Sequence, residues 1–194
     1  MKSRIYGAVM VILSMSMAAG AKVIYVDSVK APTVQGMVGF WDMNDNAATQ
    51  IVTDSSVNAN HGTAVRNTSE MTIPGKYGRA LNFNGTSDFV DLGTNSLLLP
   101  DAWTLVAWVK CQVMDSPTLF SFGRTDLTVR LQNGGKGKPV IMMGSNNYKY
   151  FTGSAWTTLQ DGQWHFVVFS VPGIAQTDIQ NAKMYLDGVP VTGT

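Results

Sequence analysis

The stretch Trp103-Thr-Leu-Val-Ala-Trp-Val-Lys110 decides the fold class, because apolar side chains occupy both of its faces. An apolar run of strand length, rich in aromatic and β-branched residues, is typical of a strand buried between two layers. Residues 164–171, Trp-His-Phe-Val-Val-Phe-Ser-Val, repeat this pattern. We therefore expect both segments to be strands of a packed core, with Trp103, Trp108 and Trp164 among the core side chains.

Outside these two runs, the sequence is typical of short strands joined by tight turns. Asp187-Gly188 is a strong signal for a two-residue hairpin turn between residues 184–186 and 189–191. No stretch of ten or more residues beyond residue 21 has a convincing helical period. Many short strands with frequent turns predict an all-β protein, either a sandwich or a barrel.

The composition fits one globular domain of 194 residues, with 45% hydrophobic and 14% charged residues. This much apolar content and this little charge argue against disorder. The net charge is +1, and the basic residues form no cluster, so nucleic acid is not an expected partner. The single cysteine, Cys111, cannot form a disulfide within the chain.

The N-terminus resembles an export signal. Lys2 and Arg4 precede an apolar run over residues 5–19, and Ala19-Gly20-Ala21 fits the small-x-small cleavage rule. We predict a signal peptide over residues 1–21, cleaved after Ala21, and a product that is secreted or at the cell surface. A retained anchor and a buried N-terminal helix are the alternatives, and the run is short for a membrane span.

Cleavage would leave a lead-in over residues 22–35, with a possible strand at 23–26. Removing Lys2 and Arg4 leaves 14 − 2 = 12 basic residues against 13 acidic ones, a net charge of −1. This near-neutral product has no polybasic stripe for a membrane surface.

Seven blocks of the chain form a pattern when they are taken in order. They are residues 36–41 (GMVGFW), 54–62 (DSSVNANHG), 75–85 (GKYGRALNFNG), 88–92 (DFVDL), 103–110 (WTLVAWVK), 164–167 (WHFV) and 184–189 (MYLDGV). Together they resemble the bacterial type of laminin G-like, concanavalin A-like domain. The resemblance implies a two-sheet antiparallel jelly-roll sandwich over residues 36–194. It also implies an extracellular location, binding of glycans or proteins, and often a structural calcium ion.

Two departures from the family pattern affect these expectations. Val57 stands where the family often has glycine. The chain also stops at Thr194, whereas family members usually continue for a few strands, the last of which pairs near the first. We expect the domain to be incomplete at its C-terminus; alternatively, a strand at residues 23–26 fills the gap.

Calcium is the cofactor that the resemblance suggests, and oxygen-bearing side chains in two loops are the candidate ligands. Residues 42–53 do not form an EF-hand loop, because Ala47 replaces the required glycine and Thr53 replaces the chelating glutamate. A looser site at the rim of the sandwich is the remaining possibility. The candidate ligands are Asp42, Asp45, Asp54, Asn58 and Asn60.

The sequence does not predict an enzyme. Glu70 is the single glutamate, so the paired carboxylates of a glucanase strand are missing. His61 lies in an Asp/Ser/Asn-rich segment before Gly62, where we interpret it as part of a turn. His165 is interpreted as a packed strand residue without an evident acidic partner.

Carbohydrate binding needs an exposed aromatic face together with polar groups for the sugar hydroxyls. Tyr148 and Tyr150 alternate with Lys149 and Phe151, so the two tyrosines are expected on one face of a strand. That face is either a binding face or simply solvated. The candidate ligand-binding residues are Asn146, Asn147, Tyr148, Tyr150 and Trp156.

We therefore expect a secreted, non-catalytic binding or adhesion module for glycan or an extracellular protein, with calcium as the suggested cofactor. Two alternatives remain: an accessory carbohydrate-binding module of a larger polysaccharide-degrading enzyme, and a structural spacer of a cell-surface protein. This expectation rests mainly on the resemblance, and a shared fold does not dictate function.

Overall fold

The computed structural model describes residues 4–13, 36–93, 102–113, 117–122, 127–131, 138–144, 146–152, 159–173 and 175–193. Within these ranges the regular structure is mainly antiparallel β-strand, and the helices α1 (Thr68–Met71) and α3 (Gln176–Gln180) span about one turn each. The all-β fold class is confirmed. The expected strand at residues 23–26 and the glycine-rich turn at residues 133–135 lie outside the described residues.

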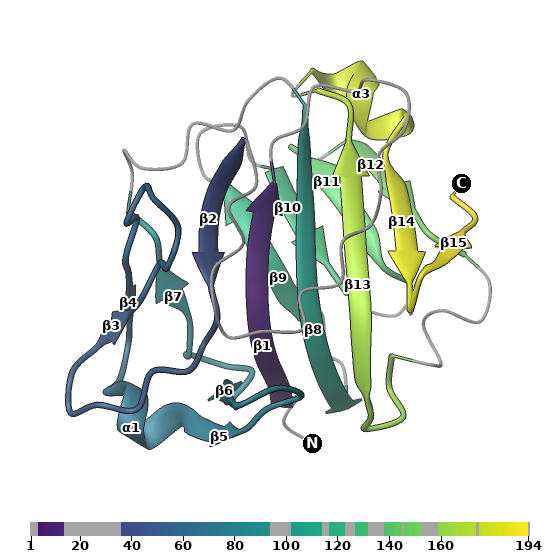
Figure 1. Ribbon diagram of the computed structural model, residues 1–194. Coiled ribbons are helices and arrows are strands. Elements are labelled where there is room, and N and C mark those ends of the chain that lie inside the picture. The colour runs from purple at the N-terminus through teal and green to yellow at the C-terminus, as the bar shows by residue number, and fades with distance from the viewer. Residues whose placement is uncertain are drawn as a thin grey trace.

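The largest sheet contains eight strands, with β13 and β8 adjacent near its middle (Figure 1). Its order is β15-β14-β13-β8-β1-β6-β5, and β2 also pairs with β1. The strands are β1 (Arg4–Leu13), β2 (Met37–Trp41), β5 (Thr72–Pro74), β6 (Arg79–Phe83), β8 (Trp103–Val113), β13 (Trp164–Val171), β14 (Lys183–Leu186) and β15 (Val189–Val191).

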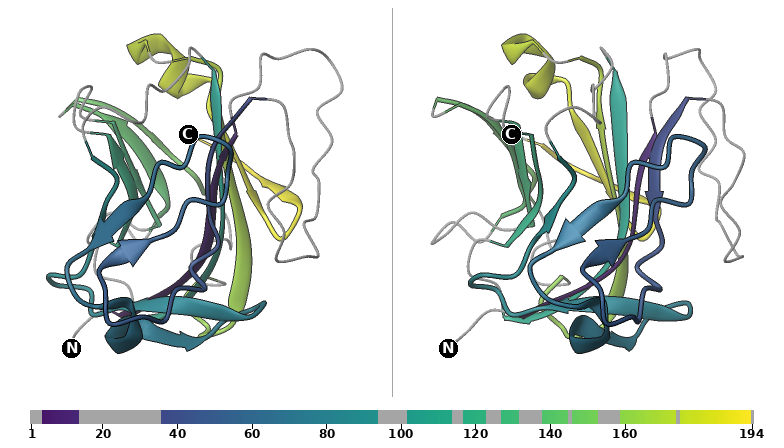
Figure 2. Two further views of the ribbon diagram at one scale, coloured as in Figure 1. Left: turned by 60° about the vertical axis from the view of Figure 1, so that its left-hand side comes forward. Right: turned by 90° about the vertical axis from the view of Figure 1, so that its left-hand side faces the viewer.

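A four-stranded sheet of order β12-β11-β10-β9 faces the large sheet and forms the second layer of the sandwich (Figure 2). A three-stranded sheet of order β3-β4-β7 lies beside these two layers (Figure 1). The remaining strands are β3 (Ile51–Val52), β4 (Gly62–Ala64), β7 (Val90–Asp91), β9 (Thr118–Phe122), β10 (Leu127–Arg130), β11 (Val140–Met143) and β12 (Asn147–Tyr150).

The core fills the space between the two larger sheets. Alternate residues of β8 and β13, such as Leu105 and Phe169, pack against Val129 of β10 and Ile141 of β11, and all four are fully buried. Burying a large aliphatic or aromatic side chain contributes about 1.5–3 kcal/mol to the free energy of folding. Trp103 belongs to this core, as predicted.

The prediction that Trp108 and Trp164 are core residues is wrong. Both lie on the outer face of the large sheet, where they are only partly buried. Trp108 packs there against Tyr77, with ring centroids 5.8 Å apart, and against Phe166, at 5.3 Å. The apolar pattern of these strands therefore reflects an aromatic cluster on the outer face as well as the core.

The predicted hairpin at Asp187-Gly188 is confirmed. Val189 pairs with Leu186 across the turn, and φ is 51° at Asp187 and 83° at Gly188. Two consecutive positive φ angles define a type I′ turn, whose twist matches that of the flanking strands.

Strand β1 occupies a position that the sequence analysis did not anticipate. Its residues pair with β8 along one edge, from Arg4 opposite Val113 to Leu13 opposite Thr104. Along the other edge, β2 pairs with residues 10–13 and β6 with residues 5–7. β1 therefore lies between β8 on one side and β2 and β6 on the other, and an incomplete C-terminus of the domain stays a prediction.

The apolar run that forms β1 is also the predicted signal peptide. Cleavage after Ala21 stays a prediction, since Ala21 lies outside the described residues. If cleavage occurs, it removes β1 and leaves the facing edges of β8, β2 and β6 without the partner shown here.

Cys111 faces the core from β8 and is fully buried. Burial raises the pKa of its thiol to about 12, because the apolar surroundings disfavour the charged thiolate.

The β1 position yields a test with the chain lacking residues 1–21. Unpaired strand edges bind other edges, so this shortened chain should associate or precipitate, whereas the full chain should not. Size-exclusion chromatography with light scattering, run on both chains at equal concentration, measures the difference. A monomeric shortened chain with a cooperative melting transition would show that the fold does not depend on β1.

Candidate functional site

The loop after β3 is organised around the buried carboxylate of Asp54. Its Oδ1 accepts hydrogen bonds from the backbone N–H of Phe40 and of Ser56, both at 2.8 Å. Its Oδ2 accepts hydrogen bonds from the Ser56 hydroxyl and the Asn60 N–H, also at 2.8 Å. Hydrogen bonds to a carboxylate are stronger than those between neutral groups, so Asp54 ties this loop to β2.

Two asparagines attach the same loop to β2. The Asn58 amide donates to the carbonyls of Met37 and Val38, and the Asn60 amide also donates to Val38. The Asn60 carbonyl in turn accepts a hydrogen bond from the indole N–H of buried Trp41, at 2.9 Å. We call Asp54, Asn58 and Asn60, with these bonds, the polar corner.

His61 belongs to the polar corner as a turn residue, as predicted. Its Nδ1 accepts a hydrogen bond from the Asp54 N–H at 3.1 Å, so in this contact the ring proton is on Nε2. Ala59 has a φ of 50°, a left-handed conformation that a non-glycine residue adopts only when its surroundings hold it there. The geometry therefore supports a structural role for this loop.

The second predicted calcium loop is also held by local hydrogen bonds. Asp42 Oδ1 accepts the Asn44 N–H at 3.1 Å, and the two carboxylate oxygens of Asp45 accept the N–H and the hydroxyl of Thr53. The described residues contain no group of three or more His, Cys, Asp or Glu side chains that could hold a metal. Asparagine and backbone oxygens are also calcium ligands, so calcium at this rim stays a prediction.

The two tyrosines predicted to share a strand face do so. Their rings lie 5.0 Å apart between centroids, with planes inclined at 59°. They project from β12, the edge strand of the four-stranded sheet, and the Tyr148 side chain is 42% exposed. A tilted aromatic pair at this distance is favourable in itself and presents a rigid apolar surface.

The other predicted ligand residues have different surroundings. Asn147 Oδ1 accepts a hydrogen bond from Gln180 Nε2 at 3.2 Å, so this amide connects β12 to α3. Lys149 strengthens that connection by donating to the Gln180 carbonyl at 2.7 Å. Asn146 is exposed in the turn before β12, and Trp156 lies outside the described residues.

His165 has two acidic partners that the sequence analysis missed. Its Nδ1 lies 2.7 Å from Asp187 Oδ2, and its Nε2 lies 3.0 Å from Asp161 Oδ1. The other oxygen of Asp187 accepts the Phe166 N–H at 2.8 Å. Because both ring nitrogens are engaged, His165 joins the start of β13 to the β14–β15 turn and has no free nitrogen to serve as a base.

We call His165, Asp161 and Asp187 the His165 trio. The electrostatics of this trio favour the charged form of the histidine. Burial lowers the pKa of His165, but the hydrogen bonds to Asp187 and Asp161 raise it by more, so the pKa lies above its usual value. The hydrogen bond from His165 lowers the pKa of Asp161. A protonated ring donates to both carboxylates at once, whereas a neutral ring can donate to only one.

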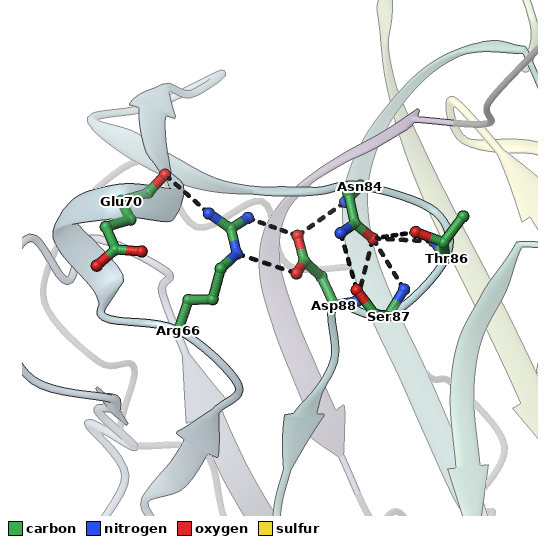
Figure 3. A network of polar contacts seen from close by, with 6 residues as sticks. All are labelled: Arg66, Glu70, Asn84, Thr86, Ser87 and Asp88. Atoms are coloured by element: carbon green, nitrogen blue, oxygen red, sulfur yellow. Dashed lines mark hydrogen bonds and ion pairs between the residues drawn. The ribbon is translucent and has the colours of Figure 1, made fainter.

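A second ion pair joins Arg66 to Asp88 (Figure 3). Arg66 donates to both carboxylate oxygens, at 3.1 and 2.6 Å, and this bond lowers the pKa of Asp88. Asp88 also accepts the Asn84 N–H, and Asn84 Oδ1 accepts the backbone N–H groups of residues 86, 87 and 88. The network closes the turn between β6 and β7.

The carboxylates of Asp88 and Asp91 are engaged in local structure. Asp88 is held by Arg66, whereas Asp91 is exposed and accepts the Gly93 N–H at 2.8 Å. Glu70 lies in α1, where its backbone carbonyl accepts a long hydrogen bond from Arg66. These contacts give no indication of the paired carboxylates that glycoside hydrolysis requires.

A two-layer sandwich with aromatic and polar groups on its rim and faces defines a class of β-sandwich binding domains. A family model described as the concanavalin A-like lectin/glucanases superfamily, of laminin G type, matches residues 84–194, more than half of the chain. The chain belongs to this family. Laminin G-like domains are typically non-catalytic binding modules and commonly extracellular, although the superfamily also includes glycosidases.

No characterised protein and no solved structure matches the chain in the other two comparisons. In the described part of the chain, the helices are too short to cross a membrane.

The polar corner predicts a large effect for Asp54→Ala. The substitution leaves donors of Phe40, Ser56 and Asn60 without their acceptor, at a cost of about 1–3 kcal/mol for each buried group. We expect the free energy of unfolding in urea to fall by about 3 kcal/mol or more. Asp42→Ala, which loses one hydrogen bond, is the matched control. Equal effects of the two substitutions would contradict the role of Asp54.

The His165 trio predicts a pH dependence of stability. The pKa of His165 is raised in the folded protein, so protonation of its ring stabilises the fold. This stabilisation is complete below about pH 6.5 and is lost as the pH rises through the raised pKa. His165→Gln should therefore lower the melting temperature most in the acidic part of a series from about pH 5.5 to about pH 9. The same series with His61→Gln, the other histidine, is the control. If His165→Gln lowers the melting temperature by the same amount at every pH, this charge-dependent role is ruled out.

Proposed function

We propose that this protein is a secreted, non-catalytic module that binds glycans through the face of β12 that carries Tyr148 and Tyr150. The observation that supports this most directly is the tyrosine pair, with centroids 5.0 Å apart on the outer face of β12. Aromatic faces pack against the apolar C–H surface of a sugar ring, and nearby polar groups bind the hydroxyls.

The support of β12 by the rest of the fold fits this role. Lys149 and Asn147, on the opposite face of the strand, are bound to Gln180 of α3. Phe151, directly after the strand, is buried and forms an isolated bridge with Gly193. These contacts fix the strand from the core side, which pre-organises the tyrosines and lowers the entropic cost of binding.

Further parts of the proposal rest on the sequence and the family. Asn146 and Trp156 are the proposed additional contacts, because they lie at most six residues along the chain from the tyrosines. Export by the signal peptide would place the module outside the cell, where glycans and glycoproteins are the available ligands. Calcium at the rim, near Asp42, Asp45 and the polar corner, is proposed as a structural ion.

A glycan array probed with the full chain and with Tyr148→Ala tests the proposal. We expect binding to a limited set of glycans, weakened about tenfold or more by the substitution, as is usual for an aromatic hot spot. Tyr77→Ala is the matched control, because Tyr77 is similarly exposed but belongs to the cluster on the outer face of the large sheet.

The same array with a chelator tests the calcium proposal separately. Loss of binding with EDTA and recovery with calcium would support a bound ion, as would a higher melting temperature in calcium. If the full chain binds no glycan with or without calcium, the glycan-binding proposal fails. In that case a spacer or a protein-binding domain becomes the better description.

A further inference from the structure

The place of β1 within the large sheet holds one strand between two edges (Figure 1). Nine residue pairs join β1 to β8 on one side, while β2 and β6 share the other side. We call this place the strand slot. Because residues 4–13 belong to the predicted export signal, cleavage after Ala21 empties the slot and leaves backbone donors and acceptors along both of its edges.

β1 pairs less regularly than the strand on the other side of β8. β13 pairs with β8 through eight consecutive residues without a shift of register. β1 shifts register against β8 twice, at residues 4–5 and 8–10, and once against β2, at residues 12–13. Each shift interrupts the ladder of hydrogen bonds. A strand of continuous register would therefore pair the edges of the slot more completely than β1 does.

The surroundings of the strand slot define the chemistry of a strand that fits it. Buried core residues flank it on both edges: Ala107 and Cys111 on β8, Leu81 on β6 and Trp41 on β2. Every second residue of an inserted strand faces this core, so those residues have to be apolar. Proline is excluded, because a central strand needs its N–H groups. The fitting strand is therefore an apolar, proline-free segment that runs antiparallel to β8.

The edge strands in the described part of the chain are too short to fill the slot of a second copy. The outermost strands of the three sheets are β15, β5, β12, β9, β3 and β7, and each contains two to five residues. Pro190 in β15 and Pro74 in β5 also lack an N–H. Since nine residue pairs join β1 to β8, a different polypeptide is the better donor.

We propose that the exported protein binds an extended apolar segment of a partner polypeptide, which inserts between β8 and the edges of β2 and β6 and completes the large sheet. Main-chain hydrogen bonds along both sides supply affinity, and the core-facing positions supply specificity. This binding requires the predicted cleavage after Ala21. It is independent of glycan binding, because Tyr148 and Tyr150 belong to the other sheet of the sandwich.

The test uses the full chain with a site-specific protease sequence inserted after Ala21. Cleavage after folding leaves the leader in place without a covalent link. A fluorescent peptide of residues 4–13, with lysines added at its end for solubility, is then titrated against the cleaved chain. We expect one peptide to bind per chain and to release the leader, which mass spectrometry detects. The uncleaved chain should bind about tenfold or more weakly, because its tethered β1 competes at a high effective concentration.

Two variant peptides separate strand pairing from adsorption to apolar surface. Val11 pairs with Val106 on one side and with Phe40 on the other. The peptide with Val11→Pro stays apolar but loses this N–H, so it should bind about tenfold or more weakly. Val9 lies at a register shift, so the peptide without Val9 has continuous register there and should bind at least as tightly as the unchanged peptide.

Three results would overturn strand insertion. Equal binding of the peptide to the cleaved and uncleaved chains, or equal binding of the proline peptide, would show adsorption elsewhere on the surface. A cleaved chain that keeps its leader and takes up no peptide, even in urea just below the unfolding midpoint, would show that β1 is a permanent strand. Self-association of the cleaved chain that the peptide does not reverse would assign the slot to a second copy.

Discussion

The rest of the structure depends on the pairing of β8 along both of its edges. A strand in the middle of a packed sheet has backbone N–H and C=O groups that water cannot reach, so each edge needs a partner strand. β13 supplies one edge through eight consecutive residue pairs from Trp164 to Val171, and β1 supplies the other. Loss of either partner would leave the backbone groups along that edge of β8 without their hydrogen-bond partners.

Charged side chains in this fold hold loops to strands where the backbone alone would leave groups unpaired. Asp54 joins the loop after β3 to β2, Asp187 joins the hairpin turn to β13, and Asp88 joins the β6–β7 turn to Arg66. In each case, the carboxylate accepts at least one backbone N–H as well as a bond from a side-chain donor. Arg130 differs from these groups, since it lies on a sheet face and its buried nitrogen has no such partner.

The sequence predicted those features that depend on neighbours in the chain. The Asp187-Gly188 hairpin follows from two residues, and the common face of Tyr148 and Tyr150 follows from alternation. The partners of His165 were missed because Asp161 and Asp187 reach it from two different loops. Trp108 was assigned to the core because an apolar pattern does not reveal whether a layer covers the outer face. The place of β1 depends on pairing with distant strands, which local patterns do not encode.

The reactivity of the Cys111 thiol reports how often the centre of the large sheet opens. Only a thiolate reacts with oxidants and alkylating agents, and a thiol with a pKa of about 12 is almost entirely protonated at neutral pH. Its backbone lies opposite Ile5 of β1, so the sulfur becomes reactive only when β8 loses its surroundings. The thiol therefore stays buried and protonated for as long as the strands around β8 stay together.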